Sequence, residues 1–352
     1  MTALDRWTIY GANGYTGELI ARRAVEQGHR PVLAGRSAAR IESLAKELGL
    51  EASVFPLNSP EQIESNLTGL RLVLNCAGPF SVTAVPWMDA CLKAGCHYSD
   101  ITGEIDVIEA ASARDSQANS ANVLLWPAVG FDVVPTDCLA AMLAQRLPTA
   151  THLQLAFAPS GAVSPGTMRT MIEQFPAGGR ARIDGQIRRV PVAWKMAKIP
   201  FADRERWAMT IPWGDVGSAY YSTGIPNIEV FAAAPRKRIR QLQWLRPLLP
   251  ALSIRPLRKW VETKAVGKAS GPTADERQSG RTQLWGRASD NGGRSVELRL
   301  TTPNGYELTV QSAIKAVETV LAAQALRGFR TPSQAFGKAF VLQLSGVELH
   351  GI

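Results

Sequence analysis

A glycine-rich turn near the start of the chain carries the clearest chemical signal in the sequence. An apolar run ends at Gly11, and an amphipathic segment begins around Gly14 and Gly17. Gly11 permits a sharp turn, Gly14 lets a pyrophosphate approach the backbone, and Gly17 lets a helix pack close to its strand. N–H groups at a helix N-terminus favour phosphate, so the spacing predicts a dinucleotide site rather than an ordinary strand-to-helix junction. The residues expected around the phosphates are Gly11, Asn13, Gly14, Tyr15, Thr16 and Gly17.

The end of the next apolar run indicates which dinucleotide is bound. A fold that prefers NAD usually places an acid here, where it hydrogen-bonds the ribose 2′-hydroxyl. This sequence has Gly35, Arg36 and Ser37 instead. A guanidinium beside a hydroxyl suits a 2′-phosphate, so we expect NADP(H) as the cofactor. The alternative is a solvent-exposed arginine at a strand end.

Further polar and glycine-containing segments follow the later apolar runs at 70–75, 97–100 and 123–127. In a doubly wound sheet, ligands bind at the carboxyl ends of the strands, beside the point where the strand order reverses. We therefore expect these segments to reach the ribose and nicotinamide. The residues concerned are Cys76, Ala77, Gly78, Pro79, Asp100, Gly103, Phe131 and Asp132.

The proton source for a hydride-transfer reaction is harder to assign. Asp100 and Glu104 follow one strand, where an acid can contact the cofactor, cap a helix or transfer a proton. Tyr220 and Tyr221 lie in a glycine-containing segment with Asp215. A tyrosine can protonate an enolate and line an acyl site, although such a pair can also be a packed aromatic contact. The catalytic candidates are Tyr221, Tyr220 and Asp100.

The N-terminal part of the chain alternates between apolar runs and helical patterns at the spacing of βαβ units. This alternation predicts a parallel, doubly wound sheet of the Rossmann type. Strands are expected at 6–11, 31–35, 52–56, 70–75, 97–100 and 123–127. Helices are expected at 15–28, 38–48, 86–94 and 105–121, with another beginning at Pro135.

The pattern changes after about residue 147. Alternating polar and apolar residues at 151–157, 283–288 and 296–301 predict a sheet with one solvated face, and therefore an antiparallel one. Helices are expected over 168–175 and 308–326. We predict an α/β fold with a Rossmann domain over 1–147, completed by 328–352, and an inserted α+β domain over 148–327.

Composition limits the class of protein. A chain of 352 residues exceeds one compact core, and 45% hydrophobic with 20% charged residues is typical of a soluble globular protein. The four cysteines and four histidines have no metal-ligand spacing. The start of the chain lacks an apolar signal-peptide core, and no apolar run reaches 18 residues. These features predict a cytoplasmic protein without a metal.

The positive charge is concentrated in one stretch. Residues 236–268 contain ten basic residues and one acid, Glu262, which together equal the net charge of +9. Tryptophans and leucines are mixed with these basic residues. Such a mixture suits an interfacial helix at an anionic membrane, where each charge contributes about 1 kcal/mol. Pro247, Pro250 and Pro256 interrupt any single helix.

Two other interpretations of 236–268 remain open. The charge would also suit an acidic acyl carrier protein or the phosphates of a coenzyme A thioester. The simplest alternative is a solvated, partly helical surface. The pattern does not fit a known nucleic-acid-binding module.

The motifs together resemble the saccharopine dehydrogenase-like superfamily, and within it the trans-acting enoyl reductase branch. The segment 214–230 resembles that branch, and 331–337 resembles the wider superfamily. The other segments that carry the resemblance are 10–17, 34–36, 75–80, 97–104 and 127–137.

The resemblance implies a Rossmann domain with an inserted second domain, NADP(H) as cofactor, and reduction of a carbon–carbon double bond in a carrier-bound or lipid-like acyl chain. One rival interpretation is a saccharopine-type C–N dehydrogenase acting on an amino acid. Another is a non-catalytic dinucleotide-binding protein at the inner face of a membrane. A homodimer is compatible with each of them.

Overall fold

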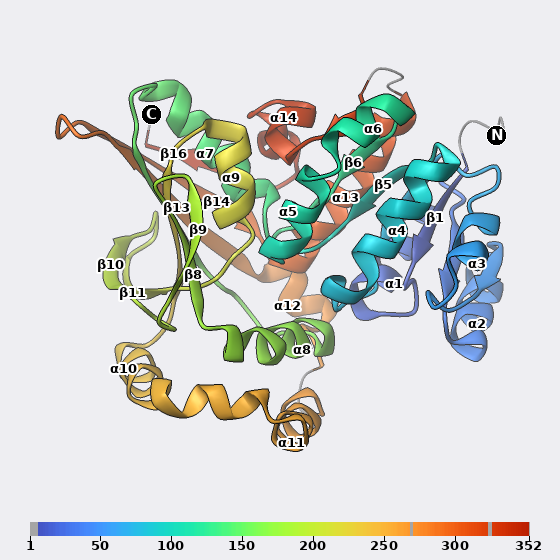
Figure 1. The fold of residues 1–352 in the computed structure, drawn as a ribbon, viewed down its shortest axis with the longest axis horizontal. Coiled ribbons are helices and arrows are strands. Elements are labelled where there is room, and N and C mark those ends of the chain that lie inside the picture. The colour runs from blue at the N-terminus through green and yellow to red at the C-terminus, as the bar shows by residue number, and fades with distance from the viewer. Residues whose placement is uncertain (1–5, 268–269, 323–325, 352) are drawn as a thin grey trace. The chain divides into compact units, whose positions relative to one another are not determined.

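Two β-sheets organise the protein, and each belongs to its own compact unit (Figure 1). The computed structural model describes residues 6–267, 270–322 and 326–351. The first unit comprises 1–131 and 309–331, and the second comprises 132–308 and 332–352. The chain therefore passes from the first unit to the second, returns once to the first, and ends in the second.

The first sheet has the strand order β15-β6-β5-β4-β1-β2-β3 among the described residues, and its strand pairings are parallel. β1 lies between β2 and β4, so the strand order reverses there. This architecture confirms the predicted doubly wound sheet. The strands are β1 (Trp7–Tyr10), β2 (Val32–Gly35), β3 (Ala52–Val54), β4 (Leu72–Asn75), β5 (His97–Asp100), β6 (Leu124–Trp126) and β15 (Gly328–Phe329).

Helices connect these strands, as parallel pairing requires. α2 buries Ile41, Leu44 and Ala45, which recur at helical spacing on one face. The helices are α1 (Tyr15–Glu26), α2 (Ala38–Leu48), α3 (Pro60–Ser65), α4 (Phe80–Ala94), α5 (Ile105–Ser112) and α6 (Asp115–Ala121). The predicted helix over 105–121 was wrong in its continuity, because it divides into α5 and α6. The predicted helix at 86–94 begins earlier, at Phe80, with Pro86 inside it.

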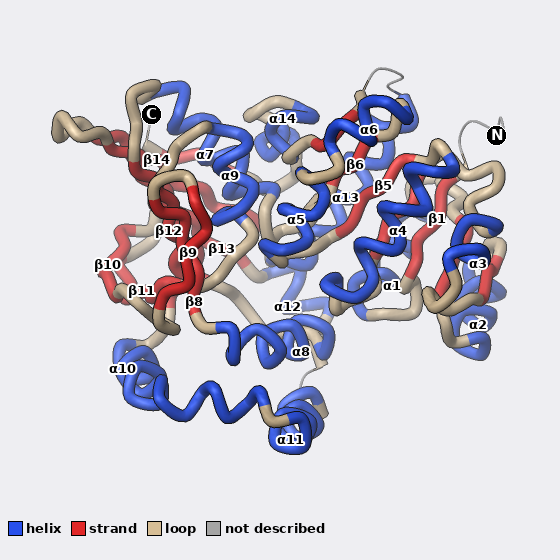
Figure 2. Tube along the Cα trace, viewed as in Figure 1, coloured by secondary structure: helices blue, strands red, loops and turns tan. Residues whose placement is uncertain are grey.

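The second sheet is mixed, with the order β10-β11-β12-β7-β13-β14-β16, and β8 pairs with β12 and with β9 (Figure 2). The antiparallel expectation holds for most pairs but fails for β12 and β7, which are parallel. The strands are β7 (His152–Ala158), β8 (Gly179–Ile183), β9 (Gln186–Val190), β10 (Met196–Pro200), β11 (Glu205–Thr210), β12 (Asn227–Ala233), β13 (Arg281–Ser289), β14 (Ser295–Pro303) and β16 (Glu348–His350).

Helix α7 (Val134–Arg146) packs against this second sheet, which explains why the second unit begins at 132. A Cβ on Gly286 of β13 would lie 2.7 Å from Leu143 Cδ1 and 3.0 Å from Leu139 Cδ2. The glycine therefore gives two leucines of α7 room to approach the strand. The predicted boundary at 147 assigned this helix to the first domain, but its packing places it in the second unit.

The remaining helices of the second unit are short. They are α8 (Pro165–Gln174), η2 (Phe175–Ala177), α9 (Asp215–Thr223), α10 (Arg236–Leu245), η3 (Arg246–Ser253), α11 (Arg255–Val266), α12 (Ala274–Ser279), α14 (Pro332–Phe336) and η4 (Phe340–Gln343). The prolines at 247, 250 and 256 divide the basic stretch into α10, η3 and α11, as the sequence indicates. Within the described residues, no helix is long and apolar enough to cross a membrane.

The C-terminal part of the chain divides differently from the prediction. β15 joins the first sheet beside β6, but β16 pairs with β14 in the second sheet, where Leu349 lies opposite Leu300. α13 (Gly305–Ala322) belongs to the first unit from Thr309 onward. The predicted helix over 308–326 includes 323–325, which lie outside the described residues.

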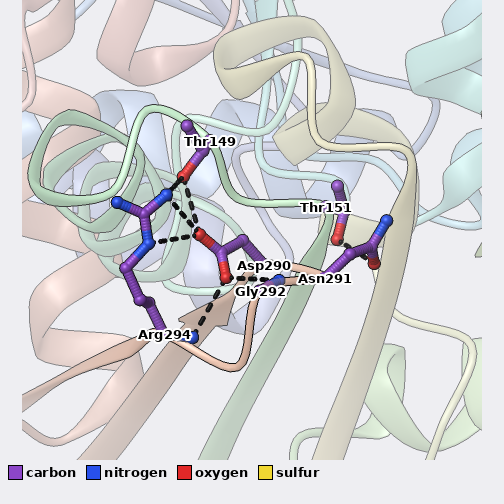
Figure 3. A network of polar contacts seen from close by, with 6 residues as sticks. All are labelled: Thr149, Thr151, Asp290, Asn291, Gly292 and Arg294. Carbon is purple, nitrogen blue, oxygen red and sulfur yellow. Dashed lines mark hydrogen bonds and ion pairs between the residues drawn. The ribbon is translucent and has the colours of Figure 1, made fainter.

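The turn of the β13–β14 hairpin is fixed by Asp290 (Figure 3). One carboxylate oxygen of Asp290 accepts hydrogen bonds from the backbone N–H groups of Gly292 and Arg294, at 2.9 and 3.0 Å. The other accepts from the Thr149 hydroxyl at 2.9 Å and from the Arg294 guanidinium. The Thr149 hydroxyl in particular holds the pKa of Asp290 below its usual value. The turn is thereby attached to the segment that precedes β7.

Gly17 offers a direct test of how closely α1 approaches the turn. A Cβ at Gly17 would lie 2.4 Å from the Gly11 carbonyl oxygen, so we expect Gly17→Ala to lower the free energy of unfolding by about 1–3 kcal/mol. Gly166→Ala is the matched control, since its Cβ would meet only Ser164 Oγ at 3.7 Å. Urea unfolding of both variants measures the difference. Equal stabilities would show that the close packing is not required.

Candidate dinucleotide-binding site

The glycine turn is held against the carboxyl edge of the first sheet. Gly11 has a φ of 81°, and its N–H donates to the Ala34 carbonyl of β2 at 2.8 Å. A Cβ on Gly11 would lie 2.8–2.9 Å from the backbone N and Cα of Ala77. Gly14 is exposed and lies directly before α1, in extended conformation. The backbone N–H groups of the first turn of α1 have no partner within the helix, so this edge can hold an anion.

The side chains expected around the phosphates surround this edge. Asn13, Tyr15 and Thr16 are partly exposed, whereas Gly17 is buried inside the helix packing. Asn13 Oδ1 lies 3.1 Å from the place a Cβ on Gly35 would occupy, which puts it beside the end of β2. Gly17 is thus packed inside the helix junction. Asn13, Tyr15 and Thr16 are accessible to a cofactor, and their contact with it stays a prediction.

Arg36 directly follows β2, and its side chain is exposed. Among the described residues, its guanidinium has neither a hydrogen bond nor an ion pair. Its positive charge acts on Tyr10 at the end of β1: burial raises the pKa of Tyr10 to about 12, and Arg36 partly opposes that rise. Ser37 lies beside it at the N-cap of α2, with its hydroxyl making no capping bond. An uncommitted guanidinium and hydroxyl fit a 2′-phosphate.

Arg36→Gln tests this assignment. Loss of charge-assisted hydrogen bonds to a 2′-phosphate should weaken NADPH binding by about 10–100-fold and leave NADH binding within twofold. Arg30→Gln, an exposed arginine before β2 and thus near the opposite end of that strand, is the control and should change neither affinity. Titration of both dinucleotides provides the measurement. An equal loss for NADPH and NADH would contradict the assignment.

Asn75, at the end of β4, shapes the loop that contains Cys76, Ala77 and Gly78. Its Oδ1 accepts from the Ala77 N–H at 3.0 Å, and its Nδ2 donates to the Thr83 hydroxyl at 3.0 Å. The Thr83 hydroxyl in turn donates to the Ala77 carbonyl at 2.7 Å. The backbone N–H and carbonyl of Ala77 are therefore both hydrogen-bonded to side chains of this loop region. These bonds fix the conformation in which Ala77 packs against Gly11.

Glu104 fixes the other end of this loop. Its buried carboxylate accepts from the backbone N–H groups of Phe80 and Ser81, at 2.9 and 2.7 Å. These are the first residues of α4, and carboxylates at a helix N-terminus satisfy its unpaired N–H groups. The bond explains why α4 begins directly after Pro79. Of the roles considered for this acid, the structure supports the helix cap.

Asp100 is fully buried and joins the loops after β5 and β6. One carboxylate oxygen accepts from the N–H groups of Thr102 and Ala128, at 3.0 and 2.8 Å, and the other accepts from the Tyr98 hydroxyl at 2.7 Å. Ala128 has a φ of 64°, which alanine rarely adopts, and its bond to Asp100 supports that conformation. This geometry gives Asp100 a positioning role at the carboxyl edge.

Burial raises the pKa of Asp100 to about 6, although its three hydrogen bonds favour the charged form. A raised pKa means that the folded state holds the proton more tightly than the unfolded state. Between about pH 4 and pH 6, stability therefore falls as the pH rises, because burial penalises the charge that appears. Well above pH 6, Asp100 is charged in both the folded and the unfolded state, and the free energy of unfolding no longer changes with pH through this group.

Asp100→Asn removes this titration while keeping a side chain of the same shape. As the pH falls from about 6 to about 4, wild type should gain unfolding free energy relative to the variant, because protonation removes the buried charge. Asp89→Asn, at an exposed position paired with Arg114, is the control for removing a carboxylate outside the buried network. Urea unfolding across this pH range measures both. A pH-independent difference between wild type and Asp100→Asn would contradict the buried-charge explanation.

The other predicted cofactor residues lie at the same edge of the first sheet or at the boundary of its unit. Cys76 is half-buried, and its removal from water and the Asp100 carboxylate raise the pKa of its thiol, so it stays protonated at neutral pH. Gly103 lies between Asp100 and Glu104 in the chain. The Phe131 N–H donates to the Thr309 hydroxyl of α13 at 2.9 Å. Asp132 is the first residue of the second unit.

Tyr220 and Tyr221 lie on α9 in the second unit. The Arg182 guanidinium lies 4.3 Å from the ring centroid of Tyr220 and 5.9 Å from that of Tyr221. Arg182 is itself buried and donates to the carbonyls of Val216 and Gly185, at 2.8 Å each. This arrangement fits the alternative of a packed aromatic pair, with a cation that stabilises the ring faces.

Sequence reasoning missed that three of the quoted motifs, 127–137, 214–230 and 331–337, meet. Thr136 of α7 donates to Asp215 of α9 at 2.8 Å, and the Ser222 hydroxyl donates to Asp137 at 2.7 Å. The Ser333 N–H also donates to Asp137. Burial, together with the charges of Asp137 and Asp132, raises the pKa of Asp215 well above its usual value. The only sequence signal was the presence of these polar residues inside apolar helices.

Within the described residues, no three histidine, cysteine, aspartate or glutamate side chains are grouped as metal ligands. All four cysteines are free thiols.

The fold and the carboxyl-edge loops thus define a dinucleotide-binding domain of the Rossmann class. Residues 7–125 match the family model described as saccharopine dehydrogenase NADP binding domain. The first unit therefore carries an NADP(H)-binding domain of the saccharopine dehydrogenase type, which confirms the predicted cofactor and resemblance.

Curated relatives match part of this chain. A trans-acting enoyl reductase of Mycobacterium tuberculosis is 32% identical over 146 residues, which are 39% of this chain and 35% of that protein. A probable mitochondrial saccharopine dehydrogenase-like oxidoreductase of Arabidopsis thaliana is 32% identical over 146 residues, covering 37% of this chain and 32% of that protein. The match thus spans about one third of the length of these relatives.

A solved structure shows that the wider fold is shared. The apo saccharopine dehydrogenase (L-Glu forming) of Saccharomyces cerevisiae matches with a TM-score of 0.64 at 9% identity, covering 98% of this chain and 100% of that one. At this identity the match establishes the α/β fold.

Proposed function

We propose that this protein is an NADP(H)-dependent oxidoreductase that reduces a carbon–carbon double bond of a carrier-bound or lipid-like acyl substrate. NADP(H) dependence is supported by Arg36. Its guanidinium is exposed, has no hydrogen bond or ion pair among the described residues, and lies beside the glycine turn of an NADP-binding domain. The enoyl half rests on the mycobacterial relatives named trans-acting enoyl reductase.

When bound, NADPH supplies a hydride to the double bond, and a proton completes the reduction. The chain's own contribution begins with placement. Gly11 and Ala77 bring two loops together, and the N–H groups of the first turn of α1 would hold the pyrophosphate. Asp100 and Glu104 fix the loops after β5 and β4, so that the carboxyl edge keeps one shape.

The proton donor is proposed among Tyr221 and Tyr220, with Asp100 as the less favoured candidate. Asp100 is fully buried and its carboxylate already accepts three hydrogen bonds, which favours positioning over proton transfer. The two tyrosines are partly exposed on α9. A phenol can deliver a proton to the enolate that hydride addition leaves on a thioester.

An enoyl thioester assay tests the proposal. The full-length protein with NADPH and a series of 2-enoyl thioesters should consume NADPH and release the saturated thioester, and kcat should fall about 10²–10⁴-fold in the variant that removes the proton donor, Tyr221→Phe or Tyr220→Phe. Tyr306→Phe, whose hydroxyl accepts from the Ser164 N–H, is the control for loss of a tyrosine hydroxyl. Mass spectrometry identifies the product.

The same assay separates the rival functions. Turnover of saccharopine with NADP⁺ and none of enoyl thioesters would replace the proposal with C–N dehydrogenation, which the plant relative's name suggests. NADPH binding without turnover of either substrate class would favour a non-catalytic dinucleotide-binding protein. Unchanged kcat in both tyrosine variants would remove these residues from the mechanism and leave the reaction intact.

A further inference from the structure

Large apolar side chains are concentrated on one exposed segment of the second unit. Trp244 is 88% exposed and Trp260 is 58% exposed. Between and beside them, Leu245, Leu248, Ile254 and Leu257 are also exposed. Single exposed apolar residues are ordinary, but a cluster of this kind marks an interaction surface. We name residues 236–267 the amphipathic segment; Lys268, which the sequence pattern included, lies outside the described residues.

The same segment carries positive charge that the protein does not neutralise. Lys237, Arg238 and Arg240 are exposed on α10, and among the described residues their side chains have no acidic partner. Lys259 is likewise exposed on α11. The single acid, Glu262, is already paired with Arg169 of α8, at 3.5 Å. The outward charge is therefore almost entirely basic.

A separate set of residues attaches the segment to its own unit. Ile239 is fully buried, and the Gln243 amide donates to the Ala193 carbonyl at 3.0 Å. Arg246 donates to the carbonyls of Val192 and Ala193. The Arg236 guanidinium lies 4.7 Å from the ring centroid of Trp207. Within this unit, α11 lies beside α8 and α10 contacts β11 (Figure 1). These anchoring contacts leave Trp244, Trp260, Arg238 and Arg240 exposed.

These observations favour one kind of occupant. Tryptophan and leucine beside arginine and lysine form the composition of helices that lie in a membrane interface, where indole rings occupy the headgroup level. A protein interface is instead depleted of charge at its core. An acidic carrier would use the arginines but would leave Trp244 and Trp260 in water. The prolines divide the segment into short helices, which suits a peripheral contact at a membrane surface and not insertion as one long helix.

We propose that the amphipathic segment is a docking surface for an anionic lipid membrane, with the basic residues at the headgroups and the tryptophans and leucines inserted between them. The contact is peripheral and reversible. It weakens as salt screens the charges, because surface electrostatics fall off within a Debye length. This role is separate from the chemistry of the proposed enzyme and requires neither cofactor nor substrate.

Vesicle co-sedimentation of the full-length protein tests the proposal. Vesicles of phosphatidylcholine with phosphatidylglycerol should bind the protein about tenfold more tightly than vesicles of phosphatidylcholine alone, and added salt should reverse the difference. Equal binding to both compositions, or binding to neither, would overturn the proposal. Selective binding of an acidic acyl carrier protein with no vesicle binding would overturn it in favour of a protein partner.

Matched variants separate the segment from the protein as a whole. Leu257→Gln and Leu342→Gln make the same change at two leucines that are each 38% exposed, and only the first should weaken vesicle binding. Arg238→Gln/Arg240→Gln should weaken it about tenfold. Arg188→Gln/Arg189→Gln removes the same charge from exposed positions on β9 and should change it less than twofold. An equal loss of vesicle binding in the two double-arginine variants would show that net charge alone is responsible, and would overturn the proposal.

Thermal unfolding of each variant confirms that the fold is retained. Vesicle binding and thioester turnover are independent measurements, so a protein that binds anionic vesicles without reducing any thioester would refute the proposed function alone. A protein that reduces thioesters but ignores vesicles would refute the docking surface alone.

Discussion

The first unit depends on close backbone packing at two glycines. They lie where β1, α1 and the loop after β4 meet, and there is no room for a Cβ at either position. Gly11 and Gly17 leave no space for a Cβ, since one would meet Ala77 and the other the Gly11 carbonyl. This close packing brings the N-terminus of α1 to the carboxyl edge of the sheet at the point where the strand order reverses. Backbone geometry there suits a phosphate, and we expect Arg36 at the neighbouring strand end to provide the preference for NADP(H) over NAD(H).

Buried polar groups then determine the shape of the loops around that edge. Asp100, Glu104 and Asn75 are buried, and each accepts hydrogen bonds from backbone N–H groups of loops or of a helix start. A buried polar group without a partner costs more than its hydrogen bond contributes, so such a network specifies one arrangement. The two acids that looked like candidate proton donors are therefore the groups that hold the site together.

The second unit is organised by its own buried polar contacts and by an exposed basic surface. α7 and α9 are joined through Thr136, Asp137, Asp215 and Ser222, which come from motifs far apart in the chain. Arg182 holds the two tyrosines of α9 as a packed group. The amphipathic segment is attached through Ile239 and Arg246. Trp244, Arg238 and Arg240 are exposed and make none of these attaching contacts, which is why we assign them to an external partner.

The sequence by itself determined the parallel sheet, the glycine turn, Arg36 and the basic stretch, because these depend on local spacing and on residue types with strong backbone or charge preferences. Only the tertiary structure decided the unit boundaries, since α7 packs on β13 and β16 pairs with β14 through contacts that no local pattern encodes. It also showed which backbone N–H groups Asp100 and Glu104 bind. A carboxylate at a strand end has the same sequence signature whether it contacts a cofactor or caps a helix, and only its burial and hydrogen-bond partners distinguish these roles.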